Sequence, residues 1–302
     1  MMKITNKTGL PEFFVDKVKG VNNAYDLRKR AENVISVTEL LNDPKYFWLK
    51  RRHDSEAEQD VQAIYYSIQG TLFHALMEGG TGDAIDEERL QLPVGDYIVS
   101  GKFDRYDGDL WDYKYTSVWS VIMGDKVKDW TKQANVYALL LERAGFKVVD
   151  MHVIAAFRDW KIREVMNGKY ELFPYEKIKL EKLSECDIME WIEGRVTELM
   201  SYNDTPDDMI PECTPKGRWQ RETKYAVMKR GNKRATALFD TYTEAGEYAR
   251  LKGTGFSVET RQGEDVRCSD MICTIKGVTL DFGHCPYRKW CNFYQRRRNE
   301  FL

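Results

Sequence analysis

The sequence predicts an α/β protein whose mixed central β-sheet is flanked by helices. Segments with apolar residues at helical spacing alternate with runs of β-branched and aromatic residues, in the order helix, helix, hairpin, helix, strand, helix. The strand expected within 147–160 is mostly apolar, which indicates burial on both faces. With 302 residues, the chain can bury a substantial core.

The composition is that of an ordinary globular protein. Hydrophobic residues make up 42% of the chain, charged residues 31%, and the formal net charge is −2. Any contact with nucleic acid must therefore come from local basic patches. No apolar run approaches the roughly 18 residues of a membrane span, and the first residues lack the apolar core of a signal peptide. We expect no membrane association and a cytoplasmic location, with reduced cysteines unless they bind metal.

Two domains are expected. The composition shifts near residues 203–208, so we predict a larger domain over 1–205 with an N-terminal helical part, and a smaller α+β module over 206–302. A second hairpin, expected over 224–239, would lie in the smaller module and turn at Gly231.

Several helices can be placed by their ends and their spacing. Ser36 with Glu39 three residues later forms a capping box. A helix is expected over 60–78, with an apolar stripe beside His74, and the acidic linker that follows it is expected to be exposed. His74 is either a satisfied core residue or a ligand. A long amphipathic helix is expected over 176–202.

Gly70 lies inside the helix expected over 60–78. Glycine in a helix costs about 1 kcal/mol relative to alanine, so we expect close packing at this position.

Residues 98–116 are expected to form a β-hairpin whose loop length decides which side chains meet. A two-residue turn would direct Asp104 and Asp112 to opposite faces. A three-residue loop centred on Gly108 would set the two acids opposite each other, with Lys114 on the same face.

With the three-residue loop, the two acids and Lys114 could form a metal-dependent hydrolytic site. Carboxylate oxygens suit Mg²⁺ or Mn²⁺, and such an ion can activate water and stabilise charge on phosphorus. A neighbouring lysine can orient the nucleophile or offset developing charge. The alternative is a solvated hairpin with ordinary surface charges.

Polar and basic residues elsewhere suggest contacts with nucleic acid. Gln133 and Tyr137 share one helix face, where they either hold a DNA backbone, buttress the metal site, or form polar tips at the edge of the core. The tip of the second hairpin is the most concentrated basic patch, with Lys229, Arg230, Lys233 and Arg234. The run 295–298 is another, and each patch can equally be solubilising surface.

Five of the six cysteines follow residue 210. Cys273 lies in an apolar run and is interpreted as a packing residue, and Cys186 as a core thiol of a helix. The others can form one four-thiolate site for Zn²⁺ or an iron–sulfur cluster: Cys213, Cys268, Cys285 and Cys291. Free thiols are the alternative.

Four motifs, taken together, resemble the RecB type of the PD-(D/E)xK nucleases in order and approximate spacing. They are Gly70-x-x-x-His74, Gly101-Lys-Phe-Asp104, Asp112-Tyr-Lys114 and Gln133-x-x-x-Tyr137. Further segments are similar to phage-encoded members: Ser36-Val-Thr-Glu-Leu, Phe157-Arg-Asp-Trp160, Glu212-Cys-Thr-Pro and Lys224-Tyr-Ala-Val. The resemblance covers most of the chain.

This resemblance implies a restriction-endonuclease-like core and assigns site residues. The metal ligands would be His74, Asp104, Asp112 and the carbonyl of Tyr113, and Lys114 would be the catalytic lysine. Gln133 and Tyr137 would lie near the DNA strand. The family proline before the first acid is replaced by Lys102-Phe103.

Several relatives in that superfamily carry a [4Fe–4S] cluster on one distant cysteine and a C-x2-C-x5-C run. This chain keeps the x5 spacing between Cys285 and Cys291, but sixteen residues separate Cys268 from Cys285. Cys213 would replace a distant cysteine that in many relatives lies upstream of the nuclease motifs.

The expected function is that of a divalent-metal-dependent deoxyribonuclease. The resemblance favours an exonuclease that acts on single- or double-stranded DNA ends in phage recombination or DNA degradation, in the host cytoplasm and with a phage recombination protein as a further partner. The alternatives are a catalytically silent DNA-binding or regulatory protein on a nuclease scaffold, and a metal-dependent phosphohydrolase of nucleotides.

Overall fold

The computed structural model describes residues 2–24, 31–79 and 84–300. The chain divides into two compact units, Met1–Ile210 and Pro211–Leu302. Helices flank mixed sheets, so the expected α/β class is confirmed. Among the helices of these described ranges, none combines the length and apolar character of a membrane span.

The first unit alternates helices and strands. Its helices are α1 (Glu12–Ala24), α2 (Val37–Leu40), α3 (Pro44–His53), α4 (Tyr65–Met77), α5 (Val118–Ile122), α6 (Asp125–Arg143), α7 (Ile162–Met166) and α8 (Glu185–Met200). Its strands are β1 (Lys3–Thr5), β2 (Val34–Ser36), β3 (Glu58–Asp60), β4 (Ile85–Asp86), β5 (Arg89–Val94), β6 (Tyr97–Lys102), β7 (Arg105–Tyr106), β8 (Leu110–Thr116), β9 (Met151–Phe157) and β10 (Tyr175–Leu180).

The central sheet of this unit has five strands in the order β10-β9-β8-β7-β4. Strands β8 and β9 are parallel, and the other neighbours are antiparallel. A parallel pair needs a long crossover, and here α5 and α6 supply it. A second sheet has the order β2-β6-β5, and β1 pairs with β3.

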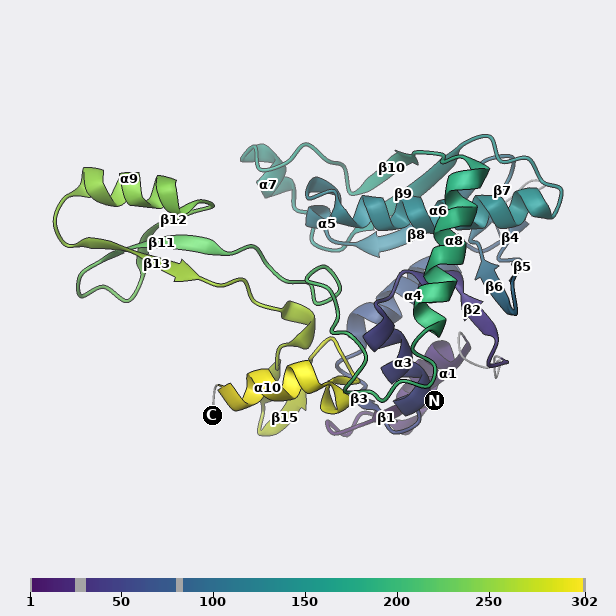
Figure 1. Cartoon of the computed structure of the whole chain (residues 1–302), viewed down its shortest axis with the longest axis horizontal. Coiled ribbons are helices and arrows are strands. Elements are labelled where there is room, and N and C mark those ends of the chain that lie inside the picture. Colours follow the sequence, from purple (N-terminus) through teal and green to yellow (C-terminus); the bar gives the residue numbers. More distant parts are fainter. Residues whose placement is uncertain (1, 25–30, 80–83, 301–302) are drawn as a thin grey trace. The chain divides into compact units, whose positions relative to one another are not determined.

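Helix α6 covers the central sheet. It contacts strands of both larger sheets, and every residue from Ala134 to Leu141 is buried. Figure 1 shows α6 lying along β8 and β9, with α8 crossing it. Strand β9 is buried along nearly its whole length, as its apolar sequence predicts.

The hairpin expected over 98–116 is shorter than predicted. Strand β6 pairs with β2 and β5 instead of β8, and only the two residues of β7 pair with the start of β8. The three-residue loop is nevertheless the one observed, because Arg105 pairs with Trp111 and Tyr106 with Leu110. The same register sets Asp104 opposite Asp112.

Close packing at Gly101 fixes β6 against the neighbouring helices. A Cβ at this residue would lie 2.6 Å from Leu140 and 2.8 Å from both Tyr137 and Val37. The backbone of β6 thus lies directly against α2 and α6, where any larger residue would clash. The chain then bends at Asp104 into β7.

Two other sequence expectations were wrong. The segment expected to begin a long helix at 176 forms the edge strand β10, with alternating exposure, and α8 begins only at Glu185 after the cap of Ser184. The Glu and Lys residues of β10 favour a helix, but they are accommodated here because an edge strand tolerates charge.

The position of Gly70 in α4 is open, since a side chain there would meet no atom within 4 Å of its Cβ, and Leu76 on the same helix is exposed. The predicted capping box of α2 is confirmed.

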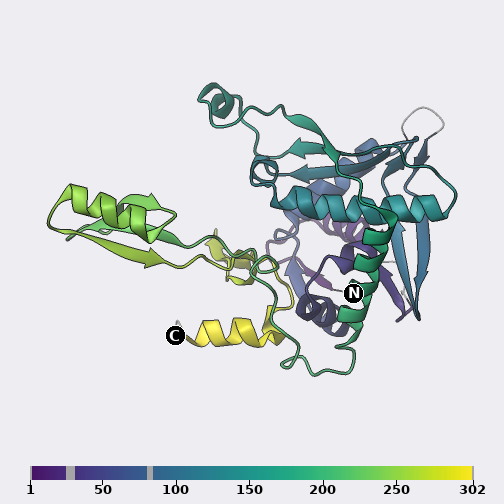
Figure 2. The ribbon, with the colours of Figure 1, turned by 45° about the horizontal axis from the view of Figure 1, so that its top comes forward.

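The second unit is a small α+β structure. It contains β11 (Lys224–Lys229), β12 (Ala235–Phe239), α9 (Tyr242–Lys252), β13 (Phe256–Arg261), β14 (Ile272–Ile275), β15 (Val278–Asp281) and α10 (Asn292–Glu300). The strands β12-β11-β13 form one sheet, and α9 packs against it, as Figure 2 shows. The predicted turn at Gly231 is confirmed, and its φ of 85° suits glycine.

Candidate functional site

The bend between β6 and β7 places Asp104 at the centre of a polar cluster. The Tyr113 amide of β8 donates to Oδ2 of Asp104 at 2.7 Å, and the Glu87 amide donates to the Asp104 carbonyl at 3.0 Å. From α4, Nδ1 of His74 lies 3.2 Å from Oδ1 of Asp104. Three separate segments therefore hold this one residue in place.

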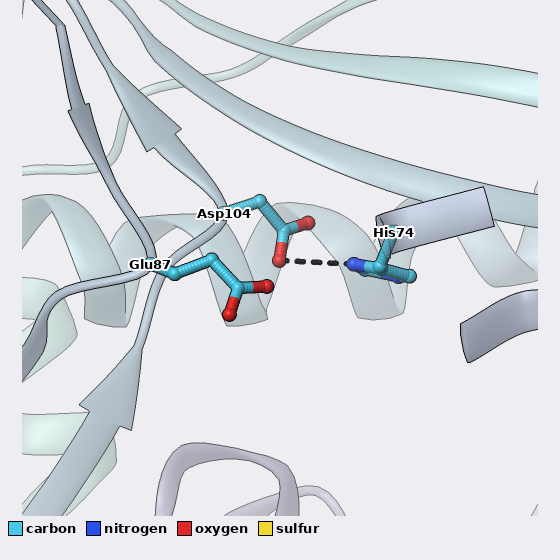
Figure 3. A group of neighbouring side chains, drawn as sticks. All are labelled: His74, Glu87 and Asp104. Atoms are coloured by element: carbon cyan, nitrogen blue, oxygen red, sulfur yellow. Dashed lines mark ion pairs between the residues drawn. The ribbon is translucent and has the colours of Figure 1, made fainter. Parts of the chain in front are cut away.

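His74, Glu87 and Asp104 form a group that can hold a metal ion. One ligand atom from each lies within 4.8 Å of the others, and Figure 3 shows the three side chains directed toward a common point. Two carboxylates and an imidazole suit Mg²⁺, Mn²⁺ or Zn²⁺. Lys102 forms an ion pair with Glu87 at the edge of the group.

Glu87 was missed at the level of sequence. It lies in the acidic stretch that was expected to be an exposed linker, yet it is only partly exposed. The residue adopts a φ of 55°, which is uncommon outside glycine, and this conformation turns the chain between β4 and β5 beside Asp104. No periodicity or motif in the sequence marks that position.

Asp112 lies next to this group and is 5% exposed. Its Oδ2 lies 2.6 Å from Nζ of Lys114. Burial raises the pKa of Asp112 to about 6; the Lys114 ammonium opposes this shift, and the negative charge of Asp104 adds to it. The influence of one acid on the other shows that they share one electrostatic environment.

A chain of polar contacts fixes the lysine. Nζ of Lys114 donates to Oε1 of Gln133 at 3.3 Å, and Nε2 of Gln133 donates to the Tyr137 hydroxyl at 3.1 Å. Tyr137 is buried, and its pKa is raised by burial and by the charge of Asp112. Of the roles that the sequence left open for this pair, these contacts suit the buttressing of the site.

The structure brings most of the predicted site together, with one difference. Asp112 does not join the closest donor group, where Glu87 stands instead. Alternation along β8 explains this, because His74 of α4 approaches the face of Tyr113, whereas Gln133 of α6 approaches the face of Lys114. Asp104 and Asp112 therefore lie in neighbouring positions, but only Asp104 belongs to the closest donor group.

The predicted basic residues of the second unit differ in their surroundings. At the tip between β11 and β12 all four are exposed: Lys229, Arg230, Lys233 and Arg234. In the C-terminal run, Arg296 pairs with Glu212 and Arg297 with the buried Asp265. The tip therefore presents cationic charge to solvent, whereas much of the C-terminal charge is compensated.

The cysteines of the second unit also differ from one another. Cys285 and Cys291 are buried, and Cys213 and Cys268 are partly exposed. Burial raises the pKa of Cys268 to about 12, and the neighbouring Cys285 and Cys291 add to the shift. Two assignments were wrong: Cys186 and Cys273 are both exposed, because Cys186 lies on the outer face of α8 and β14 belongs to an isolated two-stranded sheet.

The spacing of the thiols bears on the metal they fit. Tetrahedral zinc, with Zn–S bonds of about 2.3 Å, would hold thiolates ~3.8 Å apart. Within the described ranges, no three cysteine sulfurs lie within 4.8 Å of one another. Cys268 lies close enough to Cys285, Cys291 and Arg267 for their charges to act on its thiol. Three of the four predicted ligands therefore lie near one another.

Comparisons with known proteins identify no family. No family model matches the chain, and no curated protein matches it. Among solved structures, one titled "Crystal structure of SSO0001" is similar over 62% of this chain and 86% of that chain, with 16% sequence identity and a TM-score of 0.44. A likeness at this level does not indicate an activity, so function has to be inferred from the site itself.

Proposed function

We propose that the chain is a divalent-metal-dependent deoxyribonuclease. The observation that supports this most is the combination of a buried acid and a fixed lysine, Asp112 and Lys114, beside the donor group of His74, Glu87 and Asp104. A binding site for a cation needs only the donors. A lysine held next to them by Gln133 adds a group that can orient the attacking water and offset charge on the phosphate.

The residues of the site can be given roles. His74, Glu87, Asp104 and Asp112 would hold the ion, with the Tyr113 carbonyl as a further ligand. When bound, the ion would polarise the phosphodiester and lower the pKa of a water molecule. Asp104 is fixed for this role by the Tyr113 amide, which holds its carboxylate, and by the Glu87 amide, which holds its carbonyl.

Lys114 supplies the remaining chemistry of hydrolysis. A bond forms between the oxygen of water and phosphorus, and one ester P–O bond breaks to leave a phosphate monoester and a hydroxyl. The ammonium can donate a hydrogen bond to the attacking water and offset charge on the phosphate. Gln133 accepts from the same ammonium and thereby limits its rotation.

The remainder of the proposal concerns the substrate and the second unit. The exposed basic tip supports contact with a phosphate backbone. We assign DNA ends as the substrate, with action as an exonuclease in phage recombination or DNA degradation. The four cysteines Cys213, Cys268, Cys285 and Cys291 would hold a structural [4Fe–4S] cluster, or Zn²⁺ as the alternative.

Cleavage assays on linear, nicked and covalently closed circular DNA test the activity. With Mg²⁺ or Mn²⁺, the chain should degrade linear DNA and spare closed circles, and EDTA should stop the reaction. Asp112→Asn should abolish cleavage, whereas the matched control Asp96→Asn, in the exposed turn between β5 and β6, should retain it. Equal activity in the two variants would refute the proposal, and cleavage of closed circles would change it to an endonuclease.

The cysteine assignment has its own test. Anaerobically purified chain should absorb near 400 nm if it holds an iron–sulfur cluster, whereas colourless protein with bound zinc would favour the alternative.

A further inference from the structure

A second group of acids and a histidine lies at the start of β8 and β9. Asp109 ends the turn before β8, Asp150 precedes β9, and His152 is the second residue of β9. One ligand atom from each lies within 4.8 Å of the others. The Asp150 amide donates to Oδ1 of Asp109 at 3.0 Å, so the backbone holds the two acids together.

His152 gives this group a feature that a surface cluster of acids lacks. Its side chain is almost wholly buried, with 4% of the residue exposed. Its Nε2 faces Oδ2 of Asp109 from 3.5 Å, whereas its Nδ1 has no hydrogen-bond partner within the described part of the chain. A buried imidazole that makes few hydrogen bonds is costly, and an ion held at Nε2 between the acids would give this ring a bond that the described residues do not supply.

A neighbouring ring also holds the imidazole in place. Trp111 stacks on it with ring centroids 4.6 Å apart, which fixes the orientation of the ring.

We propose that Asp109, Asp150 and His152 form a second metal site, for Zn²⁺ or a similar divalent transition ion. One imidazole and two carboxylates are an established donor set for zinc, which binds nitrogen and oxygen at about 2.0–2.2 Å. In a tetrahedral site such bonds place ligand atoms ~3.4 Å apart, close to the 3.5 Å between His152 and Asp109. Binding there would join the starts of the two central parallel strands.

Lys179 competes with the ion for this site. Its Nζ lies 2.8 Å from Asp150, but the side chain is largely exposed and can move into solvent. Removing one positive charge at about 4 Å in a high-dielectric surrounding is worth about 1 kcal/mol, or about fivefold in affinity. The site should thus bind more tightly without this lysine.

The test is a titration of the full-length chain, labelled with ¹⁵N-histidine, with ZnCl₂. The sequence has four histidines, so each imidazole can be followed by NMR separately, and His152→Gln identifies the signals of His152. We expect a saturable shift of these signals. Asp109→Asn combined with Asp150→Asn should abolish it, whereas Lys179→Met should tighten it about fivefold.

Zinc at other sites does not confuse this readout, because each histidine reports its own surroundings. Asp104→Asn should leave the response of His152 unchanged, which separates the second site from the proposed nuclease centre. Signals of His152 that stay in place at millimolar ZnCl₂, or that shift equally in the doubly substituted variant, would overturn the proposal.

Discussion

Two groups of similar composition lie beside strand β8, and their surroundings differ. The first consists of His74, Glu87 and Asp104, and the second of Asp109, Asp150 and His152. Each offers two carboxylates and one imidazole. Beside the first group, however, a buried acid is paired with a lysine that Gln133 and Tyr137 hold in place.

The second group has a different neighbour. Its lysine, Lys179, pairs with one of the donors themselves and is largely exposed. Each group thus has an ammonium on one donor, because Lys102 pairs with Glu87 in the first. The comparison teaches that donor atoms alone do not set the two groups apart, and that the first differs by its neighbouring buried acid and fixed lysine, Asp112 and Lys114.

The largest expected difference between the two groups is in cleavage. Asp104→Asn should lower the rate of Mg²⁺-dependent DNA hydrolysis at least about 100-fold, the scale of losing one directly acting group. Asp150→Asn, in the second group, should change the rate less than about twofold, because it lies outside the reacting group. Initial rates on linear duplex DNA measure both, and a comparable loss in the two variants would remove the distinction between the groups.

The next effect is on stability in EDTA. The pKa of Asp112 is raised to about 6, so its contribution to stability is fully present below the unfolded pKa near 3.9 and is lost as the pH rises through 6. Between pH 4 and pH 7 the stability of the wild type should therefore fall by ~2 kcal/mol relative to Asp112→Asn. Urea unfolding at several pH values measures this, and a constant difference between the two proteins would contradict the buried, ionisable acid.

The second group predicts the opposite sign. Because the pKa of His152 is lowered below 6.5, mainly by burial, the wild type should lose stability as the pH falls through 6.5. His152→Gln should therefore become more stable relative to the wild type as the pH falls. The same unfolding series in EDTA measures this. Absence of the relative gain would show that His152 is a normal, solvated histidine.

Packing behind the first group predicts a smaller effect. Gly101→Ala would press a methyl group against Tyr137 and Leu140, at a cost of about 1–3 kcal/mol. Gly70→Ala, on the open side of α4, should instead stabilise the chain by up to about 1 kcal/mol. Thermal unfolding of the two variants checks these directions, and similar behaviour would mean that β6 does not lie tightly against α6.

Local sequence signals predicted part of this structure. The apolar run of β9 and the capping residues Ser36 and Glu39 are governed by near neighbours, and both predictions were confirmed. The turn at Gly108 has the three-residue register, one of the two that the sequence left open, and this register sets Asp104 opposite Asp112. Local turn geometry thus limited the arrangement of the two acids to two alternatives.

Other features depend on contacts that a sequence pattern does not show. Strand β10 was mistaken for a helix because its Lys and Glu residues favour both a helix surface and an exposed sheet edge. Glu87 joins the first group through a rare backbone conformation. His152 joins the second only because β9 runs beside the turn at Asp109, and nothing in its own segment indicates this neighbour.

The most direct test of the nuclease assignment is the single-turnover cleavage rate of Lys114→Met at saturating Mg²⁺, beside the exposed control Lys128→Met on α6. We predict a loss of about 100-fold or more for Lys114→Met with DNA binding retained, and no loss for the control. Cleavage by Lys114→Met at the rate of the wild type would show that the buried acid and its lysine do not carry out hydrolysis, and the central claim would fail.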